Sequence, residues 1–170
     1  CEEQECRGVL YTEKLALEVD KRTGSIRYLE RNGRLLLAER EENSRELEEF
    51  DSYKTVIDEN TKIEEVETAD GVKRVIKEAS MVFDKKLYHT RLHLRWQESE
   101  RLYGLGQAEE GLLNLRGSVQ YLHQANLKIA IPFLVSSNGY GILLSTGSTA
   151  IFQDTQYGSY LYTEADEEMD

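Results

Sequence analysis

The stretch "IAIPFLVSSNGYGILLS", residues 129–145, predicts a strand, a short turn and a second strand. Its apolar run 129–135 has the length of a buried strand, and Asn138-Gly139 favours the positive φ angles of a type I′ hairpin turn. Spanning a bilayer takes about 18 or more consecutive apolar residues, and no run in the chain approaches that length. The stretch therefore predicts a β-hairpin and no membrane span.

Two further hairpins are predicted in the same way. Asn32-Gly33 lies inside "SIRYLERNGRLLLAE", and Asp70-Gly71 lies inside "TKIEEVETADGVKRVIKEASMVF". Upstream, "EKLALEVD" alternates apolar and polar residues, and "KRTG" turns the chain into the first of these hairpins. Strands spaced about ten residues apart and joined by hairpins predict an all-β fold, an antiparallel β-sandwich. We expect residues 1–170 to form a single domain.

Helical periodicity is weak throughout the chain. The best candidate is "AEREENSRELEEF", residues 38–50, which carries few apolar side chains. We expect this segment to be a solvated loop or a short helix.

The charge balance argues against a nucleic-acid partner. Acidic residues outnumber basic ones 32 to 21, the net charge is −11, and no basic stripe is present. Phosphate binding needs a basic face that releases counterions. A neutral partner such as a sugar is compatible with this surface, although the surface does not imply one.

The two cysteines, Cys1 and Cys6, do not form a disulfide framework or a metal motif. Two unremarkable thiols are expected, although a bridge between them is possible in an oxidising compartment. Because the sequence begins at Cys1 without a methionine and no signal peptide precedes it, we expect a processed or cut chain. A cytoplasmic location is expected, with secretion or lipid anchoring through Cys1 as the alternative.

The sequence gives little support for the common catalytic and metal-binding motifs. His89 and His93 share one face of an expected strand, but they would stand about 13 Å apart, too far for one metal ion. Gly104-x-Gly106 lacks the third glycine of a dinucleotide loop, because Glu109 occupies its place. No G-x-S-x-G nucleophile elbow occurs. We therefore expect no metal, no cofactor and no catalytic residue in this chain.

The segment "RLYGLGQAEEGLLNLRG" (101–117) and the stretch after it carry three motifs in order. They are Y-G-x-G-Q at 103–107, N-x-x-x-x-I-P-F at 126–133 and G-Y-G-I at 139–142. Together they resemble the N-terminal β-sandwich of glycoside hydrolase family 31, which includes α-glucosidases and α-xylosidases. The resemblance implies a galactose-mutarotase-like supersandwich that precedes a separate catalytic (β/α)8 barrel.

The resemblance also gives the polar loop after Gly106 a role. In the family this loop reaches over the mouth of the barrel and helps to form the substrate pocket. Glu110 aligns with the position whose acid contacts the sugar at the non-reducing end. Weaker candidates for contacting an α-linked oligosaccharide are Gln107, Asn114, Gln124 and Asn126. For each of these four, pairing with the loop backbone is an equal alternative.

The family's catalytic aspartates belong to the barrel, and 170 all-β residues cannot contain a barrel. The resemblance therefore implies a non-catalytic domain of a retaining α-glycosidase that removes terminal α-linked glucose or xylose. We expect the fragment alone to be inactive. Three alternatives remain open: a stand-alone carbohydrate-binding module, a structural interaction domain and a mutarotase-like enzyme, although the histidines and acid that the last would need are not recognisable. Exposed aromatic residues would favour the module, and Tyr103, Tyr121 and Tyr140 are its candidates.

Overall fold

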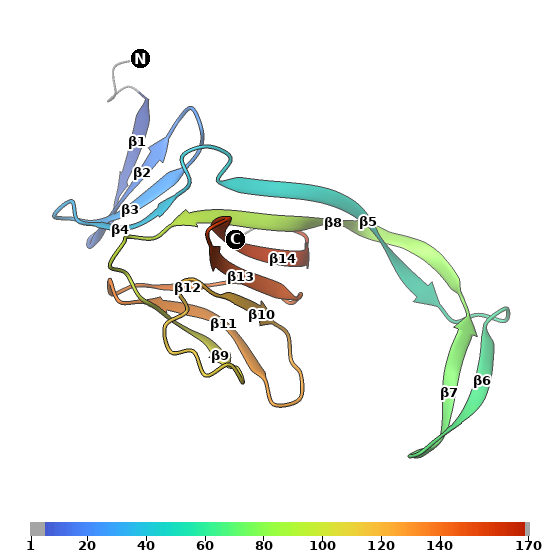
Figure 1. Cartoon of the computed structure of the whole chain (residues 1–170). Coiled ribbons are helices and arrows are strands. Elements are labelled where there is room, and N and C mark those ends of the chain that lie inside the picture. The colour runs from blue at the N-terminus through green and yellow to red at the C-terminus, as the bar shows by residue number, and fades with distance from the viewer. Residues whose placement is uncertain (1–5, 169–170) are drawn as a thin grey trace. The chain divides into compact units, whose positions relative to one another are not determined.

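The computed structural model describes residues 6–168, and all regular structure among them is β-strand (Figure 1). No helix in this described range is long and apolar enough to cross a membrane. Cys1 lies outside the range, and so do a Cys1–Cys6 bridge and an anchor at Cys1. The chain divides into two units, the first made of Cys1–Glu48 with Tyr88–Asp170 and the second of Glu49–Leu87.

Unit 1 contains two antiparallel sheets. The large sheet has the order β1-β2-β3-β4-β8-β14-β13-β10, with β5 paired to β8, and the small sheet has the order β12-β11-β9. The strands of the large sheet are β1 Arg7–Tyr11, β2 Leu15–Asp20, β3 Ile26–Glu30, β4 Leu35–Glu39, β5 Arg45–Val56, β8 Ser80–Arg95, β10 Val119–Leu122, β13 Ala150–Thr155 and β14 Gly158–Asp166. Of β5 and β8, only the residues outside 49–87 belong to unit 1. Those of the small sheet are β9 Leu102–Gln107, β11 Ile129–Ser136 and β12 Gly141–Leu143.

Side chains from both sheets of unit 1 meet in one apolar core. Leu102 and Leu134 of the small sheet and Phe152 of the large sheet are almost completely buried. Burying each of these three side chains contributes about 1.5–3 kcal/mol to the free energy of unfolding. The remaining members of the core are Leu37, Leu94, Leu105, Leu115, Leu122, Leu144, Ala150 and Leu161. Two sheets that enclose one core confirm the predicted antiparallel β-sandwich.

The three predicted hairpins are present, but their turns are not type I′. Type I′ needs positive φ at both central residues. Gly33, Gly71 and Gly139 have φ of 89°, 109° and 87°, whereas the residue before each of them keeps a negative φ. The Gly139 N–H donates to the Ser136 carbonyl at 3.1 Å, so this glycine is the last residue of its turn. The hairpin prediction is confirmed, and the predicted turn type is wrong.

The expectation of a loop or short helix over 38–50 is wrong as well. Its first residues end β4 and its last residues begin β5, which pairs with β8. In β5 most side chains are exposed, so the strand carries no apolar alternation that the sequence could reveal. Pairing with β8, a partner distant in the sequence, decides its conformation.

Unit 2 contains the hairpin of β6 (Lys62–Thr68) and β7 (Gly71–Glu78), together with the parts of β5 and β8 that fall within 49–87. Charged pairs join neighbouring strands, such as Lys54 Nζ with Asp84 Oδ1 at 2.8 Å. Apolar side chains of β6 and β7 are nonetheless exposed, and Ile63 is 51% exposed. Unit 2 is therefore a set of paired strands with little core of its own.

Candidate functional site

The end of β9 bends at three successive residues with positive φ. Gly104, Leu105 and Gly106 have φ of 99°, 61° and 97°. A Cβ atom on Gly104 would lie 2.4 Å from the Phe133 carbonyl oxygen, and one on Gly106 would lie 2.0 Å from that of Ile129. Only glycine allows β11 to approach this closely. The glycine pair of the first motif is therefore a packing requirement between two strands.

A bulge in β11 matches this bend. Ala130 pairs with Gly106 and Leu134 pairs with Gly104, so three residues of β11 stand opposite Leu105 alone. Such an excess of residues bends a strand and increases its local twist. Beyond this point the chain leaves the sheet as the polar loop 108–118, which connects β9 to β10.

Backbone hydrogen bonds fix the far end of the loop. The Asn114 Oδ1 accepts from the N–H groups of Leu102 at 3.1 Å and Arg116 at 3.3 Å. The Leu115 N–H also donates to the Leu102 carbonyl at 2.8 Å. The side-chain oxygen of Asn114 is thus engaged by the loop backbone, which is the alternative that the sequence left open for it.

Arg116 is the centre of a clamp beneath the loop. Its Nε donates to Asp154 Oδ2 at 2.7 Å, and its Nη1 donates to the carbonyls of Gln97 at 2.9 Å and Glu100 at 3.0 Å. The Gly117 N–H donates to the same Asp154 oxygen at 2.8 Å. A charge-assisted pair that also binds backbone groups holds the loop base in one position.

The Asp154 carboxylate stays ionised in this clamp. Burial alone would raise its pKa, but hydrogen bonds from Ser159, the Gly117 N–H and Arg116 outweigh burial and lower the pKa below its usual value. The ionised form is therefore favoured by the folded structure.

A second buried carboxylate, Glu100, joins the loop base to β11 and the turn after it. Its Oε1 accepts from the hydroxyls of Ser136 and Tyr140, and its Oε2 accepts from the Gln97 N–H at 2.8 Å. Burial, and then the hydrogen bond to Glu100, raise the pKa of Tyr140. Tyr140 is thus committed to an internal network rather than exposed for stacking on a sugar.

Two of the predicted site residues come together at the loop. Gln107 and Glu110 line one hollow of about 210 Å³, with Lys128 on its border and the buried Gln120 in its wall. The Glu110 carboxylate can accept hydrogen bonds from hydroxyl groups, and the Lys128 ammonium can donate them. This hollow is suited to a small polar ligand.

The other two candidates lie elsewhere. Gln124 Oε1 accepts from the Ala130 N–H at 2.6 Å and lines a separate hollow of about 290 Å³ beside β10. Asn126 is exposed in the turn closed by the Lys128 N–H and the Ala125 carbonyl, 3.2 Å apart. The structure therefore groups Gln107 with Glu110 and leaves Gln124 and Asn126 outside their hollow.

The histidines of β8 belong to ion-pair networks. His93 Nε2 lies 2.9 Å from Glu46 Oε1, and its Nδ1 lies 3.2 Å from an Arg40 guanidinium nitrogen. Because arginine can only donate, we assign the His93 proton to Nε2. Burial, and then Arg40, lower the pKa of His93. Within residues 6–168 no group of three or more histidine, cysteine or acidic side chains could hold a metal ion.

The residues that position the loop, namely Glu100, Arg116 and Asp154, were not predicted from the sequence, and neither was Lys128 on the hollow. Arg116 and Asp154 are separated by 38 residues, so no local spacing connects them. The two polar residues at the loop end, Asn114 and Arg116, were a visible sign in the sequence that this end is held by hydrogen bonds. Their partners depend on the pairing of distant strands.

Two known proteins that are similar to this chain in sequence are described as a xylosidase and a glucosidase. An alpha-xylosidase of Saccharolobus solfataricus is 34% identical over 108 residues, which is 55% of this chain and 15% of the relative. An uncharacterized family 31 glucosidase, ORF2, of Pseudescherichia vulneris is 38% identical over 56 residues, 33% of this chain and 11% of the relative. No family model matches the chain.

The fold is also found among solved structures. The GH31 alpha-xylosidase of Xanthomonas citri superposes on 91% of this chain with a TM-score of 0.64 and 23% identity, and the match covers 13% of that protein. At this identity the match establishes the fold alone. The chain thus spans only a small part of the length of the relatives it matches.

Proposed function

Because the chain is similar to glycoside hydrolase family 31 in sequence, as its three motifs predicted, and shares the fold of a family 31 structure, we propose that it is the N-terminal β-sandwich of a retaining α-glycosidase. The parent enzyme would remove terminal α-linked glucose or xylose. Its catalytic barrel would supply the two carboxylates of the reaction, one of which forms the covalent glycosyl-enzyme intermediate. The chain alone would hydrolyse nothing.

The observation that carries this proposal is the fixed polar loop. Residues 108–113 project between two anchored ends, the Gly104–Gly106 bend and the Arg116–Asp154 clamp. Gln107 and Glu110 line the same hollow at this loop. A carboxylate held on a fixed loop can bind two neighbouring sugar hydroxyls without an ordering cost at each binding event. This loop would form one wall of the substrate pocket.

An exposed apolar row on the small sheet supports the second part of the proposal, a packing surface for the barrel. Ile129, Ile131, Phe133 and Val135 alternate along β11 with exposed fractions of 50, 50, 42 and 38%, and Leu143 pairs with Phe133. A contiguous exposed apolar patch commonly marks an interaction surface. In the parent enzyme this row would face the barrel.

Glu110→Ala in the full-length parent enzyme tests the proposal. We expect KM for an α-glucoside or α-xyloside to rise about tenfold or more, because a hydrogen bond to a charged group contributes about 1.5–3 kcal/mol. Glu109→Ala is the matched control, since Glu109 is the adjacent exposed acid and does not line the hollow. Unchanged kinetics for Glu110→Ala, or equal effects of the two substitutions, would remove the loop carboxylate from the substrate pocket.

A further inference from the structure

A polar hollow of about 560 Å³ lies on the large sheet, at the part formed by β1 to β4 and β8. The strand register explains it. Glu18 pairs with Arg27, Arg27 with Ala38, and Ala38 with Arg95, so these four side chains form one row across the sheet. Neighbouring strands are about 4.8 Å apart, which separates the two arginines by about 10 Å with only a methyl group between them. The short Ala38 side chain therefore forms the floor of this sheet hollow.

The lining of the sheet hollow is highly charged, but its positive and negative side chains are equal in number. Arg27 Nη1 lies 2.9 Å from Glu18 Oε2, and Arg95 Nη1 lies 2.6 Å from Glu41 Oε1. The charged residues that line it are Arg7, Arg22, Arg27 and Arg95 with Glu18, Asp20, Glu39 and Glu41. Four positive and four negative groups leave no net charge to attract a phosphate or another strong anion. Donors and acceptors side by side suit a neutral ligand with many hydroxyl groups.

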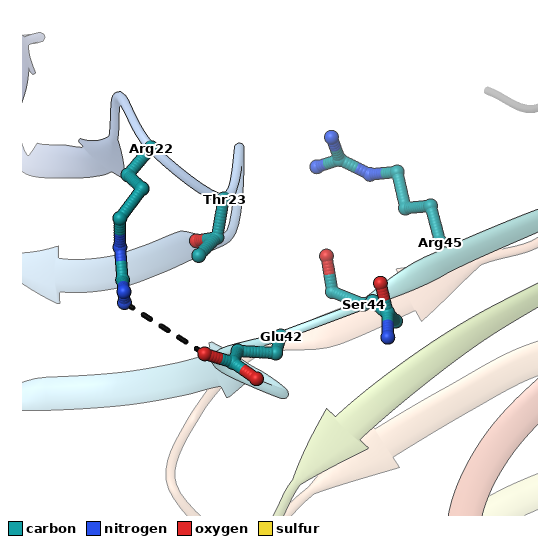
Figure 2. Close-up of a pocket in the computed structure, with 6 residues that line it drawn as sticks. Arg22, Thr23, Glu42, Ser44 and Arg45 are labelled. Atoms are coloured by element: carbon teal, nitrogen blue, oxygen red, sulfur yellow. Dashed lines mark ion pairs between the residues drawn. The ribbon is translucent and has the colours of Figure 1, made fainter.

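A second hollow, of about 390 Å³, adjoins the first at the turn between β2 and β3 (Figure 2). Arg22 and Glu42 reach toward each other across its opening, with a nitrogen–oxygen distance of 3.9 Å. The side chains of Thr23, Ser44 and Arg45 line the same opening. We call it the turn hollow. Its lining also combines charged groups of both signs with hydroxyls.

The two hollows are connected by shared groups. Arg22 lines both of them, and Arg45 of the turn hollow pairs with the buried Glu39 of the sheet hollow at 2.6 Å. Asp20 Oδ1 accepts from the N–H groups of Arg22 at 2.8 Å and Thr23 at 3.2 Å, which fixes the backbone of the turn. Each volume falls in the range of about 300–1,000 Å³ that is typical of small-molecule sites. The pair together offers room for a ligand longer than one ring.

An aromatic residue completes the sheet hollow. Trp96 lines it and rests on Phe152, with ring centroids 6.5 Å apart. Its indole Nε1 is buried and has no hydrogen-bond partner among residues 6–168. Buried donors are normally paired, and leaving one unpaired costs about 1–3 kcal/mol. Because this nitrogen is buried, Trp96 offers the hollow its ring atoms rather than a donor.

From this combination we propose that the sheet hollow and the turn hollow form a binding site for a neutral oligosaccharide, separate from the loop around Glu110. The row of ion pairs supplies donors and acceptors for sugar hydroxyls, and Trp96 supplies an apolar surface for a sugar ring. The two hollows in series accommodate successive sugar units. This site requires no barrel and does not depend on the proposed enzymatic role.

Tryptophan fluorescence tests the site directly, because Trp96 is the single tryptophan of the chain. The full chain is titrated with glucose, maltose and maltotriose, and with inorganic phosphate at matched ionic strength. We expect a saturable change with the sugars at Kd values of about 1 mM, tightening from glucose to maltotriose, and no saturable change with phosphate.

Two substitutions locate the binding. Ala38→Met fills the floor of the sheet hollow, and Arg95→Gln removes a donor whose side chain is 60% exposed and whose loss spares the core. Each should weaken maltotriose binding about tenfold, equivalent to about 1.4 kcal/mol. Arg74→Gln is the matched control, because Arg74 also pairs with an exposed acid, Glu65, at 3.2 Å but lies in unit 2.

Three results would overturn the proposal. The first is the lack of a saturable response to any of the three sugars. The second is wild-type affinity in both Ala38→Met and Arg95→Gln, which would place binding elsewhere. The third is saturation by phosphate alone, which would make the hollow an anion site.

Discussion

Asp154 shows how a single residue controls the loop of the candidate site. Its side chain is 9% exposed, and it binds both the Arg116 guanidinium and the Gly117 N–H. Removing one member of such a pair leaves the other charge buried without compensation. The loop geometry that brings Gln107 and Glu110 together therefore depends on a residue of a different strand.

Asp154→Asn should destabilise the chain by about 3 kcal/mol near neutral pH, because it leaves Arg116 without its counter-charge. The loss should also depend on pH. The pKa of Asp154 is lowered by folding, so its contribution is present above the unfolded pKa of about 3.9 and is lost as pH falls through the folded value. Urea denaturation of both proteins between pH 7 and about pH 3 measures this difference. A gap that stays constant down to the lowest pH would show that the carboxylate charge is not what stabilises the loop.

Among the strands, the sequence predicted those features that short segments determine by themselves. The apolar runs and the Asn-Gly and Asp-Gly pairs correctly predicted three hairpins, because turn residues and alternation are properties of short segments. β5 was missed, since its side chains are mostly exposed and only pairing with β8 makes it a strand. Motif resemblance named Gln107 and Glu110 as candidates for sugar binding, and the structure places them at one hollow. The supporting clamp was not predicted, because the clamp joins residues distant in sequence.

The β9 bend gives a prediction that separates crowding from backbone strain. Gly106→Ala and Gly33→Ala both place a side chain at a positive φ, of 97° and 89°. The new methyl group at 33 meets open space, whereas at 106 it would lie 2.0 Å from the Ile129 carbonyl oxygen. Gly33→Ala should lower the free energy of unfolding by about 1–2 kcal/mol. Gly106→Ala should lower it by at least about 2 kcal/mol more. Equal urea midpoints for the two variants would mean that β9 and β11 are not held this close together.

At the scale of the whole molecule, the two units differ in how they are stabilised. Unit 1 has the common core of the two sheets, whereas the exposed apolar side chains of unit 2 include Ile63, Val72 and Ile76. A two-stranded hairpin alone is marginally stable in water. Stability should therefore be unevenly distributed along the chain.

Native-state hydrogen exchange should show this difference. We expect the amides of β6 and β7 to exchange by local opening, at least about a hundredfold faster than those of β13 and β14, because opening them exposes little buried surface. Equal protection of the amides in both pairs of strands would contradict this. It would indicate that unit 2 is stabilised by a core or a partner beyond the contacts described above.

We propose that this chain is one domain of a longer α-glycosidase, and the coding sequence downstream of codon 170 tests this most directly. We expect an open reading frame that continues into alternating strands and helices of a (β/α)8 barrel with the catalytic aspartates. A stop codon at or near Asp170 would contradict it, and a sugar-binding domain that acts without a barrel would then be the better explanation of the fold.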